Sequence, residues 1–257
     1  MSVVVLTSAS GSPGVTTTTL WLACTWPRPA IAVEADPVGG SAMLAGFFGG
    51  FQAPPQSVVD LLLAHRNARL AEQFPQSLLE VKGTAASVLP GPRSHAQAHS
   101  ALELWEPLSM IWKALGGSGT DVLIDAGRLG MESYAEVLLR HSDLVLLVTK
   151  ADLPCLAAAK QWAEGALETH RLHPETPAWA VVLVGSGHPY SSKEVSSVLD
   201  LPVLAQLPFD PKGASAYSHG SRRKRKTRLS RGLLACGDRV RDQLAAADRL
   251  LAPGGGS

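Results

Sequence analysis

The sequence has little net charge, few cysteines and no long apolar run. Its 257 residues include 23 lysines and arginines against 22 aspartates and glutamates, which gives a formal net charge of +1. Such a balance creates no overall field toward nucleic acid or an anionic membrane, so an electrostatic function needs a local cluster. The cysteines, Cys24, Cys155 and Cys236, lie far apart and outside any C-x-x-C pair. This argues against a zinc site or a disulfide framework and fits a reducing cytosol.

The sequence also shows no segment with the hydropathy pattern of a membrane span or a secretory signal. No uninterrupted apolar run approaches the roughly 20 residues that span a bilayer. No basic segment precedes the short apolar run in MSVVVLTSAS, so we expect no secretory signal. Hydrophobic residues nevertheless make up 46% of the chain, which is enough for a sizeable core. We therefore expect a globular, cytoplasmic protein.

Short aliphatic runs recur along the chain, and most are followed by a stretch with helical spacing. The runs are continuously apolar, which indicates strands covered on both faces, as in a parallel sheet between helices. The sequence thus predicts an α/β fold with a doubly wound, mostly parallel sheet, whose ligands bind at the carboxyl ends of the strands. We expect strands at 2–7, 30–35, 86–90, 121–126, 143–149, 178–184 and 202–208, and helices at 57–71, 101–115, 131–141, 155–170 and 192–199.

One domain accounts for nearly all of these elements. We expect the α/β domain to occupy residues 1–219, followed by a basic connector at 220–231, a helix docked on the same domain at 232–252 and a flexible tail at 253–257. The Pro/Gly-rich segments 49–57 and 89–100 are expected to form surface loops.

The stretch TSASGSPGVTTTTLWLA, residues 7 to 23, has the outline of a phosphate-binding loop between a strand and a helix. A nucleotide P-loop has the form G-x-x-x-x-G-K-[ST]: backbone N–H groups hold the phosphates, the lysine neutralises charge and the hydroxyl binds magnesium. Here Gly11 opens the frame, Thr16 replaces the second glycine, Thr17 replaces the lysine and Thr18 keeps the hydroxyl. The context fits a phosphate site, but its cation is missing.

This loop resembles the deviant Walker A sequence, G-K-G-G-V-G-K-T-T, of the MinD/ParA class of P-loop ATPases. Gly11, Gly14, Val15, Thr18 and Thr19 match that sequence. The resemblance implies the fold of that class and a site for ATP or ADP with magnesium. Within the class, the chain is most similar to divergent MinD-like proteins akin to the CpaE/TadZ pilus-positioning proteins and the septum-site-determining proteins.

The resemblance extends to later motifs and implies roles for their residues. VEADPVGGSA looks like the second-strand motif, which places Asp36 near the attacking water. TDVLIDAGRLG is similar to the Walker B segment, which implies that Asp125 binds magnesium together with Thr18 of the phosphate loop. Arg128 stands where a substitute cation for the γ-phosphate could lie, and Pro208 belongs to the loop that contacts adenine. The implied nucleotide-binding residues are Gly11, Ser12, Gly14, Val15, Thr16, Thr17, Thr18, Thr19, Arg128 and Pro208.

Both lysines of the class are absent. Ser12 occupies the place of the lysine that reaches across a nucleotide-sandwich dimer, and Thr17 that of the loop lysine. A charge-assisted hydrogen bond contributes about 1.5–3 kcal/mol, so its loss lowers nucleotide affinity by about one to two orders of magnitude. Hydrolysis suffers more, because the cations stabilise the transferring phosphoryl group. A purely structural alternative is that GSPGVTTTT is only a strand-to-helix turn whose threonines cap the helix.

The segment RRKRKTRLSR is the local basic cluster of an otherwise balanced chain. So many neighbouring positive charges repel one another unless an anionic partner binds them. We leave four alternatives open for the cluster: nonspecific DNA, anionic lipid, an acidic protein, or solvent alone. A membrane role for the following helix is less favoured, because aspartates interrupt its polar face and aromatic anchors are missing. The cluster comprises Arg222, Arg223, Lys224, Arg225, Lys226, Arg228 and Arg231.

Together these observations favour a MinD/ParA-like pseudo-ATPase, a positioning, partitioning or scaffold protein with lost or weakened ATP binding. The resemblance implies protein partners in a division, secretion or pilus system, and a homodimer. Two alternatives stay open: a slow ATP-dependent dimer switch of the same class, and a nonspecific DNA-binding module that uses the basic cluster.

Overall fold

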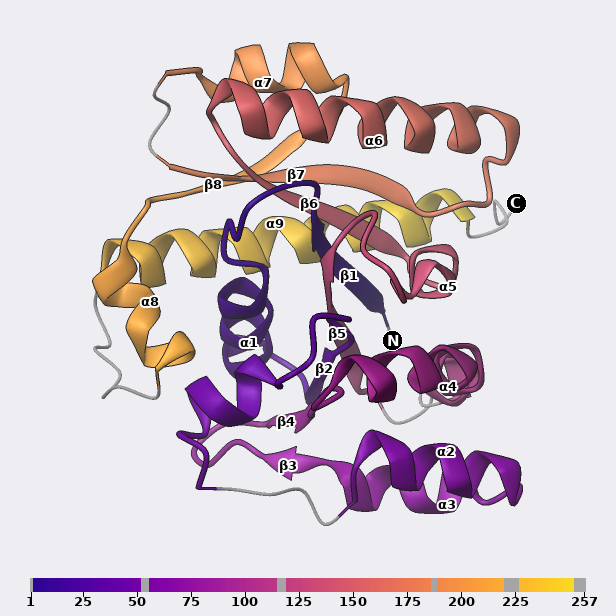
Figure 1. Cartoon of the computed structure of the whole chain (residues 1–257). Coiled ribbons are helices and arrows are strands. Elements are labelled where there is room, and N and C mark those ends of the chain that lie inside the picture. Colours follow the sequence, from indigo (N-terminus) through magenta and orange to yellow (C-terminus); the bar gives the residue numbers. More distant parts are fainter. Residues whose placement is uncertain (1, 52–55, 115–118, 186–188, 220–226, 252–257) are drawn as a thin grey trace, which may run out of the picture.

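One sheet of eight strands forms the centre of the molecule in a computed structural model. Its order is β3-β4-β2-β5-β1-β6-β7-β8, with β1 in the interior and later strands added on both sides (Figure 1). All neighbours are parallel except β3, which pairs antiparallel with β4. The structure describes residues 2–51, 56–114, 119–185, 189–219 and 227–251. The strands are β1 Val3–Ser8, β2 Ala30–Glu34, β3 Leu79–Glu80, β4 Ala86–Leu89, β5 Asp121–Arg128, β6 Leu144–Lys150, β7 Ala178–Val184 and β8 Val203–Leu207.

Helices cover both faces of this sheet, which confirms the doubly wound α/β fold expected from the sequence. One face carries α2 Val58–Arg66, α3 Leu70–Gln73, α4 His95–Ala114, α5 Glu136–Arg140, α6 Leu153–Leu172 and α7 Ser192–Leu199. The other carries α1 Val15–Thr25, α8 Pro211–Ser218 and α9 Arg228–Leu251, together with the π-helical turn Met43–Phe47; the 3-10 turn Phe74–Ser77 follows α3.

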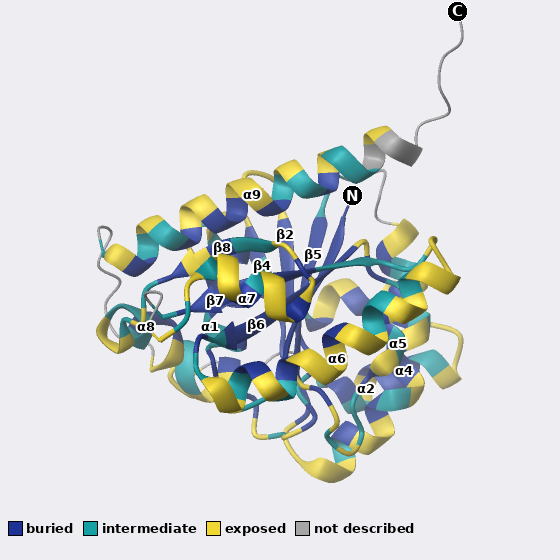
Figure 2. Cartoon of the chain, turned by 90° about the horizontal axis from the view of Figure 1, so that it is seen from above, coloured by how far each residue is buried: buried dark blue, intermediate teal, exposed yellow. Residues whose placement is uncertain are grey.

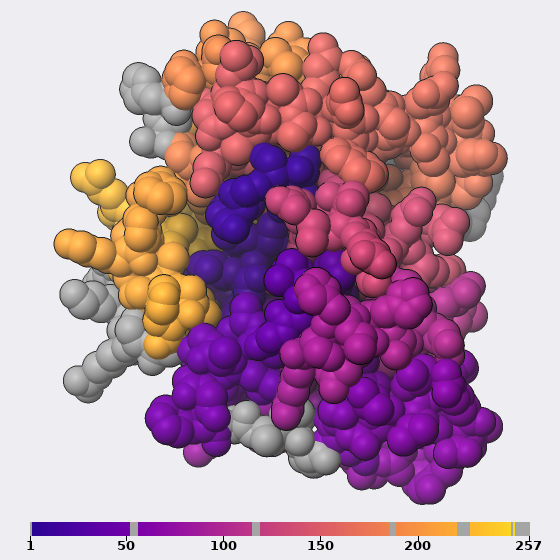
Figure 3. Space-filling model, viewed as in Figure 1, coloured from indigo at the N-terminus to yellow at the C-terminus, as the bar shows by residue number. Residues whose placement is uncertain are grey.

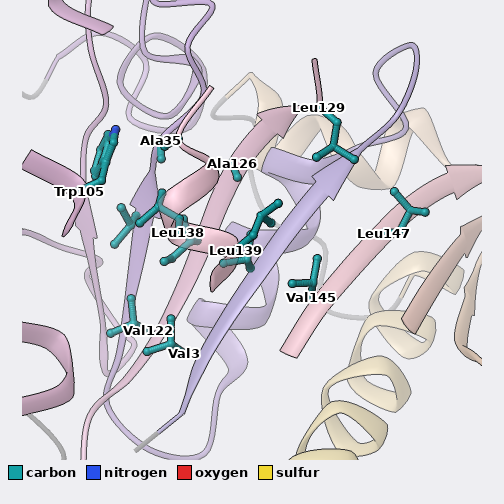
Figure 4. Close-up of a cluster of buried hydrophobic side chains, with 14 of the residues drawn as sticks. Val3, Ala35, Trp105, Val122, Ala126, Leu129, Leu138, Leu139, Val145 and Leu147 are labelled. Carbon is teal, nitrogen blue, oxygen red and sulfur yellow. The ribbon is translucent and has the colours of Figure 1, made fainter. Parts of the chain in front are cut away.

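The alternation of side chains along each strand supplies both cores. On β5, Val122, Ile124 and Ala126 face the layer of α4 to α6, whereas Leu123 faces α1. Figure 4 shows the first of these layers, where side chains of β1, β5 and β6 meet Trp105 of α4 and the leucines of α5. Because both strand faces are buried, the continuous apolar runs of the sequence are explained.

Helix α9 packs along one edge of the molecule, against β8 and α1. Its buried side chains recur every three or four residues, whereas the opposite side of the helix is exposed (Figure 2). The buried residues are Leu229, Leu233, Cys236, Val240 and Leu244. Among all helices in the described ranges, none is both long enough and apolar enough to cross a bilayer.

Several local expectations were wrong. The helix expected at 57–71 is divided into α2 and α3, with a left-handed Ala68 (φ 56°) between them, and α9 begins at Arg228, inside the expected connector. The segment 89–100 is not a loop throughout, because α4 begins at His95: its prolines and glycine end at residue 92, and Ala98 faces the core. The helix expected at 131–141 shrinks to α5, because Ser133 has a left-handed backbone (φ 61°) that interrupts it. The short antiparallel edge strand β3 was not predicted at all.

Candidate functional site

The loop between β1 and α1 has the backbone shape of an anion-binding turn. Gly11 and Gly14 have φ values of 23° and 102°, and Ser12 has a φ of 36°. Gly14 is the N-cap of α1, and no side chain in the described chain caps the helix. Its first backbone N–H groups therefore lack intrahelical partners and carry the positive end of the helix dipole. In Figure 3 this indigo N-terminal part lies in the middle of the visible face.

The capping role suggested for the threonines is wrong. The N-cap is a glycine, which has no side chain, and the threonines lie inside the first turns of α1. Thr19 donates its hydroxyl to the carbonyl oxygen of Val15 at 3.0 Å, one turn back. Thr18 is buried, and Thr16 and Thr17 are half-buried. The turn between β1 and α1 is therefore not capped by a threonine side chain.

Asp125 lies at the base of this loop, near the carboxyl end of β5. Its side chain is fully buried. Oδ1 accepts the backbone N–H of Gly127 at 3.0 Å, while Oδ2 has no hydrogen-bond partner in the part of the chain that the structure describes. Burial raises the pKa of Asp125 to about 7, against the effect of the Thr16 hydroxyl, which favours the charged form. The structure thus brings Thr16 to the carboxylate expected to bind magnesium.

Glu34, at the end of β2, is a second buried carboxyl group that the sequence analysis missed. It accepts hydrogen bonds from Ser41 Oγ at 2.5 Å, Gly91 N at 2.9 Å and Met43 N at 3.0 Å. Burial raises its pKa, and the three donors oppose the rise. The signal was present in the sequence as a single acid within the apolar run AIAVEA. Glu34 ties together the loops that follow β2 and β4.

Asp36 completes a group of three carboxyls. It lies so close to Gly127 that a Cβ there would come within 2.6 Å of Asp36 Cγ, and the backbone of Gly127 is left-handed (φ 67°). Both Asp36 and Glu34 raise the pKa of Asp125 through charge repulsion. No ion pair joins any of the three to a lysine or arginine within the described ranges. The loop base is therefore an acidic site without the compensating cation of a P-loop.

Within the described ranges, neither Arg128 nor Pro208 forms a hydrogen bond or an ion pair with this group. The Arg128 side chain is exposed, and its Nη2 lies 2.8 Å from the sulfur of Met131. Pro208 follows the edge strand β8 and packs toward α9, where a Cβ on Gly232 would lie 3.1 Å from Pro208 Cδ. The structure thus assembles Thr16, Asp36 and Asp125 and records no contact of Arg128 or Pro208 with them.

A hydroxyl chain connects the end of β5 to the segment that follows it. Tyr134 donates its hydroxyl to Thr7 Oγ1 at 3.1 Å, and Thr7 Oγ1 donates to the carbonyl oxygen of Gly127 at 3.1 Å. Burial raises the pKa of Tyr134, so the phenol stays protonated and acts as a donor. Leu129 N also donates to Ser8 O at 2.8 Å. These bonds hold the segment after Asp125 against the start of the phosphate loop.

Most of the basic cluster lies outside the described residues. Arg228 and Arg231 are exposed in the first turn of α9. Within the described ranges, no three His, Cys, Asp or Glu side chains are placed to hold a metal ion among themselves. The cluster residues without a description are Arg222, Arg223, Lys224, Arg225 and Lys226.

Comparisons with known proteins identify the fold. No family model matches the sequence, and no curated protein does. Among solved structures, the chain is similar to the septum site-determining protein MinD of Pyrococcus horikoshii in complex with Mg-ADP, with 18% identity, a TM-score of 0.73 and coverage of 96% of this chain and 98% of that one. It is also similar to MinD in the MinC:MinD complex of Aquifex aeolicus (17% identity, TM-score 0.71, coverage 94% and 96%). A ParA family ATPase of Chlorobium tepidum gives 14% identity, a TM-score of 0.69 and coverage of 92% and 97%.

Proposed function

We propose that this chain, which has the fold of the MinD and ParA ATPases, is a pseudo-ATPase that acts as a cytoplasmic positioning, partitioning or scaffold protein. Its nucleotide chemistry is weak or lost, and it works through protein partners. The resemblance of the loop to the MinD/ParA class, seen in the sequence, is confirmed at the level of the fold.

The observation that carries the proposal is the uncompensated group of Glu34, Asp36 and Asp125. A nucleoside triphosphate brings several negative charges to a loop whose lysine positions hold Ser12 and Thr17. Without a lysine, the phosphates would interact only with the dipole of α1 and its backbone N–H groups. The three carboxyl groups nearby would repel them. Burying like charges together without a cation is costly, which works against tight binding.

The donors present fit magnesium in part. The partnerless Oδ2 of Asp125 and the retained hydroxyl of Thr18 are oxygen ligands of the kind magnesium prefers. Bound with a nucleotide, the ion would supply positive charge between the phosphates and Asp125. The group that is missing is the side-chain cation that neutralises the phosphates themselves. Magnesium would therefore find oxygen ligands here, whereas the phosphates would find no side-chain cation.

One observation favours the alternative of a slow, ATP-dependent dimer switch. The N-terminus of α1 is uncapped and follows a left-handed Gly14, a geometry suited to an anion. In this alternative Asp36 orients the attacking water, Asp125 holds magnesium and Arg128 turns from Met131 to the phosphates on binding. Alanine at Asp36 or Asp125 then abolishes turnover, whereas indifference to both changes excludes the switch.

The partners proposed for the chain are proteins, with a second copy of the chain and DNA as further candidates. The MinC:MinD complex shows a protein of this fold bound to a protein partner. The cluster Arg222 to Arg231 is the proposed contact for DNA, and such binding falls steeply with salt because it releases counterions. Neutralising the cluster removes DNA binding if this role is correct, and unchanged affinity excludes it.

Calorimetric titration of the purified chain with ATP and ADP, each with and without magnesium, tests the central proposal. The expected result is no binding, or binding only near millimolar nucleotide. Micromolar affinity together with magnesium-dependent turnover overturns the pseudo-ATPase assignment and establishes the switch. The two proposals thus differ in nucleotide affinity and in turnover, both measured on the unmodified protein.

A further inference from the structure

A cavity of about 660 Å³ lies on the helical face opposite α1, away from the phosphate loop. It is bounded by α5, α6, the segment after Asp125 and the start of β7. Its volume falls in the range of small-molecule pockets, roughly 300–1,000 Å³. Its walls include the rings of Trp162 and Trp179, the side chain of Leu139 and the backbone of Gly130.

The chain leaves this space open through its small residues and the shortness of α5. Gly165 lies in the wall formed by α6, and a Cβ added there meets no atom within 4 Å. A Cβ on Gly130 would lie 3.4 Å from Trp162 Cζ2, so the tryptophan ring borders the segment after β5. Helix α5 spans only Glu136–Arg140, which leaves part of the layer between α4 and α6 uncovered. The opening therefore depends on Gly130, on Gly165 and on the short helix α5.

Two charged side chains line the cavity, Glu136 and Arg140, and they define the charge it accepts. Arg140 lines it and forms no ion pair with another described residue. Glu136, one turn earlier on α5, also lines it and opposes a second negative charge in a ligand. Aromatic walls favour a flat ring, and a guanidinium favours a carboxylate or sulfonate. These features select a planar aromatic molecule with a single anionic group.

We propose that this cavity is a binding site for a planar aromatic monoanion, whose ring contacts Trp162 and Trp179 and whose anionic group pairs with Arg140. The site is separate from the phosphate loop and does not depend on nucleotide binding. Tyr134, which lines the cavity, also donates to Thr7 at the start of that loop. A ligand here therefore lies beside Tyr134, whose partner Thr7 donates to the carbonyl oxygen of Gly127.

Two fluorescent probes with the same ring system test the site. 8-Anilinonaphthalene-1-sulfonate carries one sulfonate, and N-phenyl-1-naphthylamine is its uncharged counterpart. Titration of the full chain should show one sulfonated probe bound per chain. Arg140→Gln should weaken the sulfonated probe by about tenfold, because a charge-assisted hydrogen bond is lost, and leave the neutral probe unchanged.

A pair of substitutions at Gly165 tests the location. Gly165→Phe fills the cavity and should abolish binding of both probes. Gly165→Ala adds one methyl group where nothing clashes, improves helix propensity and should leave both affinities within about threefold of wild type. Trp162→Ala should weaken both probes without overfilling the site, which guards against misfolding of the Phe variant. Thermal unfolding and circular dichroism verify the fold of each variant.

Loss of both probes in Gly165→Phe, weaker binding of both in Trp162→Ala and selective weakening of the sulfonated probe in Arg140→Gln support the site. Unchanged probe affinity in folded Gly165→Phe or in Trp162→Ala overturns it. Displacement of the probe by ATP also overturns it, because that result places the probe at the phosphate loop instead.

Discussion

The Cβ that Gly127 lacks would lie 2.6 Å from Cγ of Asp36 and 3.1 Å from its Cα. These two residues come from the ends of neighbouring strands, β2 and β5, and are packed as closely as the absence of a side chain allows. Asp36 in turn accepts the backbone N–H of Val38 through Oδ1 at 2.9 Å. The position of Asp36 thus depends on a glycine in another motif.

Gly127→Ala should be destabilising for two reasons. Its φ of 67° is costly for alanine, by about 1 kcal/mol or more, and the new Cβ has to displace Asp36. Gly83 is a matched control, since its φ is 77° and an added Cβ meets nothing within 4 Å. Urea denaturation should show a larger loss of unfolding free energy for Gly127→Ala than for Gly83→Ala. Equal losses would mean that the contact with Asp36 contributes nothing.

Glu34→Ala should lower the free energy of unfolding by about 2–4 kcal/mol, because it leaves the backbone N–H groups of Met43 and Gly91 and the hydroxyl of Ser41 without their buried acceptor. Glu80→Ala, an exposed glutamate on the edge strand β3, is the control and should change stability by less than about 0.5 kcal/mol. Chemical denaturation at pH 7 measures both. Similar small effects would show that Glu34 does not hold these loops.

The sequence predicted the sheet well because continuous apolar runs report burial on both strand faces. It also placed the ligand site at the carboxyl ends of the strands, where Asp125 of β5 and Asp36, just after the neighbouring β2, are found. Neither the placement of Glu34 nor the contact between Asp36 and Gly127 could be predicted, because both depend on side-chain packing between loops distant in the chain. The spacing of residues in a motif does not indicate which distant loops will contact each other.

The ends of the helices and the position of the Arg128 side chain could not be predicted from the sequence either. The start of α4 at His95 was missed because nearby prolines and glycine obscured a good helical sequence, and α5 was overestimated because nothing in the sequence revealed the left-handed Ser133. Arg128 was proposed as a substitute cation from its spacing to Asp125. Its position on the sulfur of Met131 follows from the path of the chain beyond Gly127, which the spacing does not define.

Asp125 should make stability fall as the pH rises. Its pKa is about 7 in the folded chain and about 4 in the unfolded chain, so the folded state holds the proton more tightly. The stability gained from protonation is complete below pH 4 and is lost as the pH rises through 7, a difference of about 4 kcal/mol at most. Glu34, whose pKa is also raised, acts in the same direction.

Asp125→Asn isolates that contribution, because asparagine keeps an oxygen for the Gly127 N–H and has no charge to bury. The variant should match wild type near pH 4 and exceed it in thermal stability at pH 8. Melting temperatures at both pH values, measured in the same ionic strength, provide the test. A constant difference between the two proteins across this range would show that Asp125 does not titrate in the folded chain.

Thr17→Lys should restore nucleotide binding in part. The half-buried Thr17 lies in the first turn of α1, and a lysine there adds the cation that the three carboxyls and the phosphates lack. A charge-assisted hydrogen bond of about 1.5–3 kcal/mol corresponds to a gain in ATP affinity of about 10- to 100-fold. Thr17→Gln provides a long polar side chain without charge and should remain at the wild-type affinity. Calorimetry with magnesium and ATP compares the three proteins. If lysine and glutamine give equal affinities, the missing charge is not what weakens the loop, and the shape of the Gly11–Gly14 backbone becomes the cause to test.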